Sequence, residues 1–184
     1  DRDPDDPTRV TRVGTEWLPT AEIRRVRPRA VPGVEVGMDR LAAMADGDGY
    51  AAALGPMVDA YGAWLREQRE IALDSDARRA TRDALVDQAE HARQRIADGI
   101  RLLGEDAEVR AAFALMNRAM AESSRAQRPH VAEPEWRLFQ LAFVLANLRG
   151  VADGKHPDRK TVELIFFPTG GGKTEAYLGV IAFT

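Results

Sequence analysis

Apolar positions recur at helical spacing through the middle of the chain, from residue 38 to about residue 127. The spacing of three and four residues predicts helices over 38–45, 49–73, 77–104 and 107–125. Polar residues at 74–76 can cap the third helix, and a glycine at 104 can end it. Acidic and basic residues are balanced here, as on solvated helix faces. The sequence therefore predicts a helical domain over 38–128.

The first 37 residues show no such pattern. Prolines stand at positions 4, 7, 19, 28 and 32, and each removes a backbone donor and disfavours helix in the residue before it. We expect an extended, Pro-rich N-terminal arm over 1–37.

The pattern changes again after residue 128. Residues 133–148 are strongly apolar and predict a buried helix, and a polar loop follows at 153–160. Residues 161–167 are rich in β-branched and aromatic side chains, which predicts a buried parallel strand. Three glycines and a further helix from Thr174 come next. This order of helix, strand, glycine loop and helix predicts that an α/β domain begins within 129–184.

Composition narrows the function classes. The 184 residues include no cysteine, so disulfides and Cys-ligated metal sites are excluded. The three histidines are far apart, which argues against a zinc hydrolase. A net charge of −3 gives no polybasic surface, and neither a secretory signal nor a membrane-spanning run is recognisable. We therefore expect a cytoplasmic protein that does not bind membranes.

The strongest chemical signal is the glycine run at 170–172 followed by Lys173 and Thr174. Glycines let successive backbone N–H groups converge on an anion, and the N-terminus of the following helix favours negative charge. A lysine here reaches the β- and γ-phosphates, and the adjacent hydroxyl binds Mg²⁺. Gly170, Gly171, Gly172, Lys173 and Thr174 are the predicted ATP–Mg²⁺ site, with Lys173 and Thr174 catalytic and Thr174 the metal ligand. Thr169 is expected to orient the loop.

The use of lysine supports this interpretation. Lys and Arg together number 26, but only positions 155, 160 and 173 are lysine, which leaves 23 arginines. One of three lysines thus stands where a compact point charge is needed. The pattern departs from the usual phosphate loop at its first position, where Phe167 replaces Gly or Ala. The alternative is an accidental glycine turn after a buried strand.

A second element lies 33 residues before Lys173. Arg137 and Gln140 form an Arg-x-aromatic-Gln sequence at the start of an apolar helix. A Gln carboxamide can pair with the N6 and N7 edge of adenine, which would select ATP over GTP. Trp136 or Phe139 could provide an apolar wall for the base. The alternative for Arg137 and Gln140 is a solvated pair on a helix.

With these motifs, the chain resembles superfamily 2 helicases and translocases of the restriction-related branch, and more narrowly the helicase subunits of the DISARM anti-phage defence system. The resemblance covers most of the chain. It is carried by the sequences at 16–21, 32–35 and 116–120 and by Phe-Phe-Pro-Thr-Gly-Gly-Gly-Lys-Thr-Glu-Ala-Tyr-Leu-Gly at 166–179.

The resemblance implies an α-helical N-terminal region followed by the start of an α/β RecA-like P-loop NTPase domain. It also implies ATP and Mg²⁺ as cofactors, with DNA and a partner subunit of a defence complex as partners. The family's acidic motif, coupling motifs and arginine finger have no counterpart here. We therefore expect these residues alone to be inactive, and to leave the apolar residues of 164–167 and of the last helix partly unburied.

Two other functions stay open at this point. A P-loop kinase or nucleotide switch would use the same loop without translocation. A helical interaction module with a vestigial loop would use residues 38–127 and bind no nucleotide.

Overall fold

The computed structural model describes residues 5, 8, 14, 30–44, 46–167 and 170–184. Most of the predicted arm at 1–37 lies outside these residues, as do Pro168 and Thr169. The helices of the described part are α1 (Met38–Ala42), α2 (Gly47–Arg69), α3 (Asp76–Glu105), α4 (Ala107–Gln127), α5 (Leu138–Ala152), the 3₁₀ helix η1 (Pro157–Lys160) and α6 (Lys173–Phe183).

Side-chain caps fix where the long helices begin. Asp46 accepts a hydrogen bond from the Gly49 N–H at 2.7 Å, and Asp106 accepts from two first-turn N–H groups of α4 at 2.9 and 3.1 Å. Ser75 caps α3 through the Arg78 N–H at 3.3 Å. Such bonds satisfy donors that have no acceptor within the helix. The predicted helices of 38–127 are confirmed, although α3 continues through Gly104 to Glu105.

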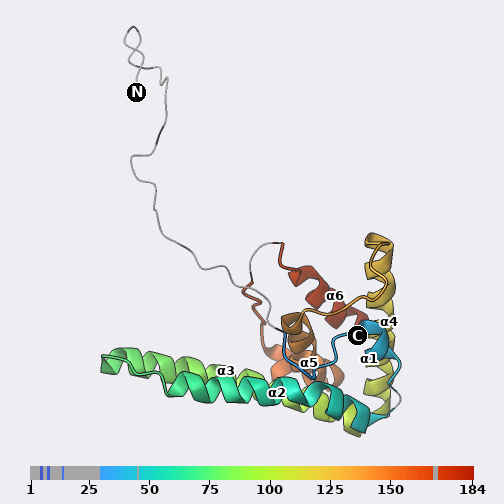
Figure 1. Cartoon of the computed structure of the whole chain (residues 1–184), viewed down its shortest axis with the longest axis horizontal. Coiled ribbons are helices and arrows are strands. Elements are labelled where there is room, and N and C mark those ends of the chain that lie inside the picture. Colours follow the sequence, from blue (N-terminus) through green and yellow to red (C-terminus); the bar gives the residue numbers. More distant parts are fainter. Residues whose placement is uncertain (1–4, 6–7, 9–13, 15–29, 45, 168–169) are drawn as a thin grey trace.

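The helices form an elongated hairpin and a compact end (Figure 1). α2 and α3 lie antiparallel and extend to the left of the view, while α4 stands across the other end of the pair. α5 packs against both α3 and α6, and α6 also packs against α4. None of the described helices is both long and apolar enough to cross a bilayer.

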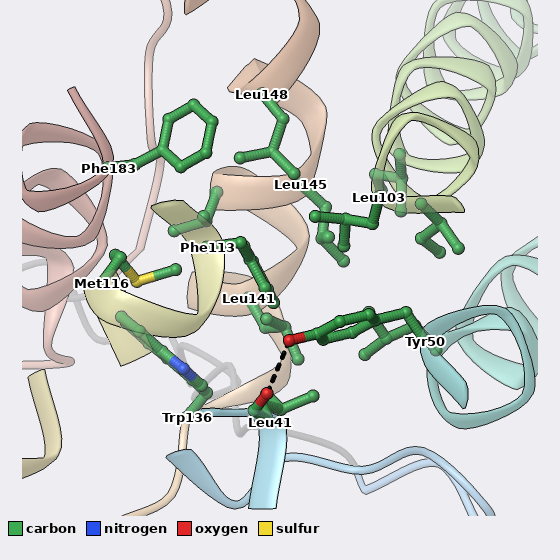
Figure 2. Close-up of a cluster of buried hydrophobic side chains, with 14 of the residues drawn as sticks. Leu41, Tyr50, Leu103, Phe113, Met116, Trp136, Leu141, Leu145, Leu148 and Phe183 are labelled. Carbon is green, nitrogen blue, oxygen red and sulfur yellow. Dashed lines mark hydrogen bonds between the residues drawn. The ribbon is translucent and has the colours of Figure 1, made fainter. Parts of the chain in front are cut away.

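One hydrophobic core joins the early and late helices (Figure 2). α5 is apolar around most of its circumference, as expected of a buried helix, and the side chains of Leu141, Val144, Leu145 and Leu148 are at most 1% exposed. The core extends from Met38 in α1 to Phe183 in α6. The region that carries the glycine loop therefore shares its packing with the helical region that precedes it.

The helix predicted over 133–148 begins later than expected, at Leu138. Residues 134–136 are extended instead, because their backbone pairs with residues near the start of α1. The Met38 N–H donates to the Pro134 carbonyl at 2.9 Å, and the Trp136 N–H donates to the Val36 carbonyl at 2.8 Å. This pairing fixes the segment that leads into Arg137.

Glu35 stabilises that pairing. Its carboxylate accepts from the Gly37 N–H at 2.6 Å and from Arg40 Nε at 2.7 Å. The Arg40 hydrogen bond lowers the pKa of Glu35 below its ordinary value of 4.5, and the Gly37 N–H acts in the same direction against burial. The charged form is therefore favoured in the folded state.

We expect Glu35→Gln to reduce the free energy of unfolding at pH 7 by about 0.5–1 kcal/mol, a small value because Arg40 is half exposed. A lowered folded pKa gives stability that is present above pH 4.5 and lost as the pH falls through the folded pKa. The difference between wild type and variant should therefore shrink below about pH 4. Denaturation from pH 3 to pH 7 measures this, with the exposed Glu122→Gln as control; a difference independent of pH would contradict it.

The strand predicted over 161–167 is absent. Within the described residues the backbone forms only an isolated bridge between Gly37 and Glu135, and residues 161–167 pair with no neighbouring strand. Val162, Leu164 and Phe166 are 88–94% exposed, whereas the residues between them are half buried. A strand needs a partner that supplies its ladder hydrogen bonds, and the described residues contain none. The expected exposure of apolar residues here and on α6 is confirmed.

Candidate functional site

Two of the three loop glycines adopt a left-handed backbone conformation. Gly170 has a φ of +77° and Gly172 has a φ of +84°, a region that disfavours side chains. A Cβ atom on Gly172 would also lie 2.6 Å from Gln140 Nε2. The backbone conformation thus favours glycine at position 172, and a side chain there would also displace Gln140, which agrees with the predicted phosphate loop.

The loop leads directly into α6. Gly172 is the N-cap residue, and a glycine has no side chain with which to cap the first N–H groups of the helix. Lys173 and Thr174 occupy the first turn, where the helix dipole favours an anion. Thr174 is exposed to solvent. A phosphate could therefore reach the first turn of α6.

Lys173 folds back across the loop. Its ammonium group donates a hydrogen bond to the Phe167 carbonyl oxygen at 2.5 Å. A lysine that binds nucleotide phosphates would exchange this carbonyl for phosphate oxygens, a stronger charge-assisted interaction. The ammonium group is thus held close to the place where the predicted function needs it.

Two side chains from the start of α5 hold the loop by its carbonyl groups. Arg137 Nη1 donates to the Gly171 carbonyl, and Gln140 Nε2 donates to the Gly172 carbonyl at 2.6 Å. Gln140 Oε1 accepts from the Arg137 N–H at 2.8 Å and so caps α5. Gln140 is only 4% exposed. Each end of its carboxamide makes one backbone hydrogen bond, which leaves a second N–H of Nε2 and a second lone pair of Oε1 for a ligand.

The two aromatic residues considered as walls for a base have different surroundings. Trp136 is 3% exposed, and its indole N–H donates to Asn117 Oδ1 in α4 at 2.7 Å. Phe139 stacks on Phe167, with ring centroids 4.1 Å apart and an angle of 16° between the planes. Trp136 is thus a core residue, and Phe139 supports the residue that precedes the loop.

The predicted site residues surround one cavity of about 490 Å³. This volume lies within the range of small-ligand sites. The lining residues are Met38, Arg128, Glu135, Arg137, Gln140, Gly170, Gly172, Lys173, Thr174 and Glu175. The Gly171 carbonyl accepts a hydrogen bond from Arg137, which is one of these lining residues. Thr169 lies outside the described residues. The structure thus brings together two motifs that are more than 30 residues apart.

Sequence reasoning missed three members of this lining. Met38, Arg128 and Glu135 come from the start of α1, the end of α4 and the extended segment before α5. No motif marks them, because their approach to the loop depends on how α1 and α4 pack. Arg128 matters most, since it adds a third cation to Arg137 and Lys173.

A larger cavity of about 630 Å³ does not suit phosphate. It lies where Tyr61 and Trp64 of α2 approach Phe139 and Phe167, and its lining is mainly apolar. Glu67 is the only charged residue among its described lining residues. A phosphate there would meet a carboxylate and no cation. Of these two cavities, the one at the glycine loop is the better candidate for a nucleotide, because three cations and two of the loop glycines line it.

Comparison with known proteins agrees with the resemblance to the DISARM system. No protein-family model matches the chain. The chain is 38% identical over 145 residues to the DISARM protein DrmA of Bacillus paralicheniformis. The matched region covers 71% of this chain but only 13% of that protein, so the chain spans a small part of its curated relative. Over the matched region, the chain is DrmA-like.

Proposed function

We propose that this chain provides part of the ATP site of a DISARM-type helicase or translocase that acts in anti-phage defence. One structural observation carries the proposal: Arg137, Gln140 and Lys173 converge on the glycine loop at the N-terminus of α6. The similarity to DrmA supports the defence role. In the intact protein, ATP hydrolysis would be coupled to movement on DNA, and a partner subunit would belong to the same defence complex.

The roles follow from the chemistry of each group. Backbone N–H groups of Gly170–Gly172 and the first turn of α6 would surround the phosphates, and Lys173 would contact the β- and γ-phosphates. The Thr174 hydroxyl would hold Mg²⁺, which neutralises phosphate charge when bound. A side chain at 172 would instead press on Gln140 and Arg137, which hold the loop.

The proposal includes a RecA-like fold for the region that begins within residues 129–184. Residues 161–167 alternate exposed and half-buried side chains directly before the loop, as an extended segment does. Their exposed apolar side chains would pack on the faces of a sheet if the backbone paired with neighbouring strands. Further chain in a longer protein would supply the neighbouring strands, and the curated relative is long enough to contain them.

The test is nucleotide binding and turnover by the intact protein. We expect ATP–Mg²⁺ to bind and DNA to stimulate its hydrolysis. Turnover unaffected by DNA or RNA would favour a nucleotide switch or kinase. Failure to bind any nucleotide would overturn the proposal in favour of a helical interaction module.

Gln140 has two roles in this proposal, support of the glycine loop and contact with adenine. Gln140→Ala, measured with three ligands, separates them. Loss of the Gly172 contact should weaken GTP and inorganic tripolyphosphate by about tenfold, because the loop loses a support. If the carboxamide turns to adenine once nucleotide binds, Gln140→Ala should weaken ATP by a further several-fold. Titration calorimetry with the three ligands measures both effects.

The control for this experiment is Gln88→Ala, which removes an exposed carboxamide from α3 and should leave all three affinities unchanged. Equal losses for ATP and GTP would assign Gln140 to loop support alone. Unchanged affinity for tripolyphosphate would exclude loop support.

A further inference from the structure

Arg128 is the charged residue that the helical region of 38–128 contributes to the described lining of the loop cavity. It directly follows the last residue of α4 and lines the same cavity as Lys173 and Thr174, 45 residues later in the chain. Its backbone N–H donates to the Ser124 carbonyl at 2.9 Å, which fixes the point where the side chain leaves the helix. The end of α4 thus presents a guanidinium group to the predicted phosphate site.

The Arg128 guanidinium group has a neutral hydrogen-bond partner. Arg128 Nη2 donates to the Ser124 hydroxyl at 3.0 Å, and no ion pair joins Arg128 to a carboxylate of the described residues. Arg125, one turn earlier, is different: its two terminal nitrogens bind the Asp39 carboxylate at 2.8 and 2.9 Å. A guanidinium on a hydroxyl keeps its full charge and most of its donors. Arg128 is therefore equipped to bind an anion.

The charges around the cavity favour a polyanion. The charged residues of the described lining are Arg128, Arg137, Glu135, Lys173 and Glu175. Glu135 is offset in part by Arg40, whose Nη2 lies 3.7 Å from the carboxylate. Arg137 and Lys173 donate to loop carbonyls, which carry no net charge. The lining thus has one cation in excess, while a nucleoside triphosphate carries several negative charges.

We propose that Arg128 is a phosphate-binding residue of the nucleotide site, supplied in cis by the helical region. This inference rests on the proposed function, because it concerns the same ligand. The planar guanidinium would donate two parallel hydrogen bonds to phosphate oxygens, which an ammonium group cannot reproduce. Ser124 would act as a positioning residue that keeps the side chain on the cavity side of α4.

The test measures binding of inorganic tripolyphosphate and ATP to the intact protein. We expect Arg128→Ala to weaken both ligands by about tenfold, and Arg128→Lys to recover only part of that loss. The dependence of affinity on salt concentration should also become shallower, because one phosphate contact is removed. The matched control is Arg118→Ala, which removes an exposed arginine from the same helix outside the cavity.

The outcomes distinguish this inference from the proposed function. Wild-type affinity in Arg128→Ala, with weakened binding in Lys173→Ala, would overturn the role of Arg128 and leave the nucleotide site intact. Failure of the wild type to bind either ligand would overturn both. Circular dichroism melting of each variant identifies a folding defect. If Arg128→Ala melts early, Arg128→Gln provides the comparison, and wild-type affinity in that variant would overturn the inference.

Discussion

Replacing Lys173 by alanine is expected to abolish nucleotide-dependent activity of the intact protein. The substitution removes the ammonium group that the structure holds against the Phe167 carbonyl at the loop. In the proposed complex this group stabilises charge on the transferred phosphoryl, and loss of one such interaction lowers turnover by about 100-fold or more. DNA-stimulated release of inorganic phosphate from ATP is the measurement. Affinity for ATP should also fall, because a charge-assisted contact is lost.

The chain offers a close control for this substitution. Lys155 is exposed in the polar loop between α5 and η1, and Lys155→Ala removes the same charge from a site away from the cavity. It should leave turnover unchanged. Undiminished turnover in Lys173→Ala would show that the glycine loop is not the catalytic phosphate site.

Replacing Gly99 by alanine is expected to separate α3 from α5. A Cβ atom on Gly99 would lie 2.0 Å from the Leu145 carbonyl oxygen, closer than any real contact, and the obstacle is backbone that cannot rotate away. The helices must move apart, which opens the core around Leu145. Overpacking of this kind costs about 3 kcal/mol. For a region of this size that lowers Tm by roughly 6–12 °C.

Hydrogen exchange in the intact protein locates the damage, since faster exchange should appear in peptides that cover 138–152 as well as in α3. Gly104→Ala is the matched control on the same helix, because a Cβ there meets no atom within 4 Å. That change should be neutral or stabilising by about 0.5–1 kcal/mol. Equal stability of the two variants would show that the close crossing is absent in solution.

Local signals were sufficient to predict the long helices. Ser75 and Asp106 cap α3 and α4 in the structure, and periodic apolar positions between them become the buried faces. The start of α5 was placed five residues too early, because the backbone of 134–136 bonds to residues nearly 100 positions before it. Residues 161–167 were predicted as a strand from their composition. Strand formation depends on a distant partner, which single-sequence patterns do not show.

The residues of the candidate site also fall into two groups, those that local sequence predicts and those that only the fold brings together. The glycines, Lys173 and Thr174 could be predicted because the loop is contiguous and its chemistry requires those residue types. Gln140 and Arg137 could be anticipated from their Arg-x-aromatic-Gln sequence 33 residues before Lys173, but their bonds to the loop carbonyls could not. Arg128 had no signal, because the packing of α4 alone brings it to the loop.

The tight packing in the middle of α6 has a consequence for how the glycine loop can move. A Cβ atom on Gly179 would lie 2.9 Å from the Trp136 ring, so α6 crosses the indole with no spare room, and Asn117 fixes the same indole to α4. A tilt of α6 at its N-terminal end must therefore displace Trp136, break its bond to Asn117 or carry α4 with it. We therefore expect a movement of the N-terminal end of α6 to be transmitted to α4 through Trp136 and Asn117.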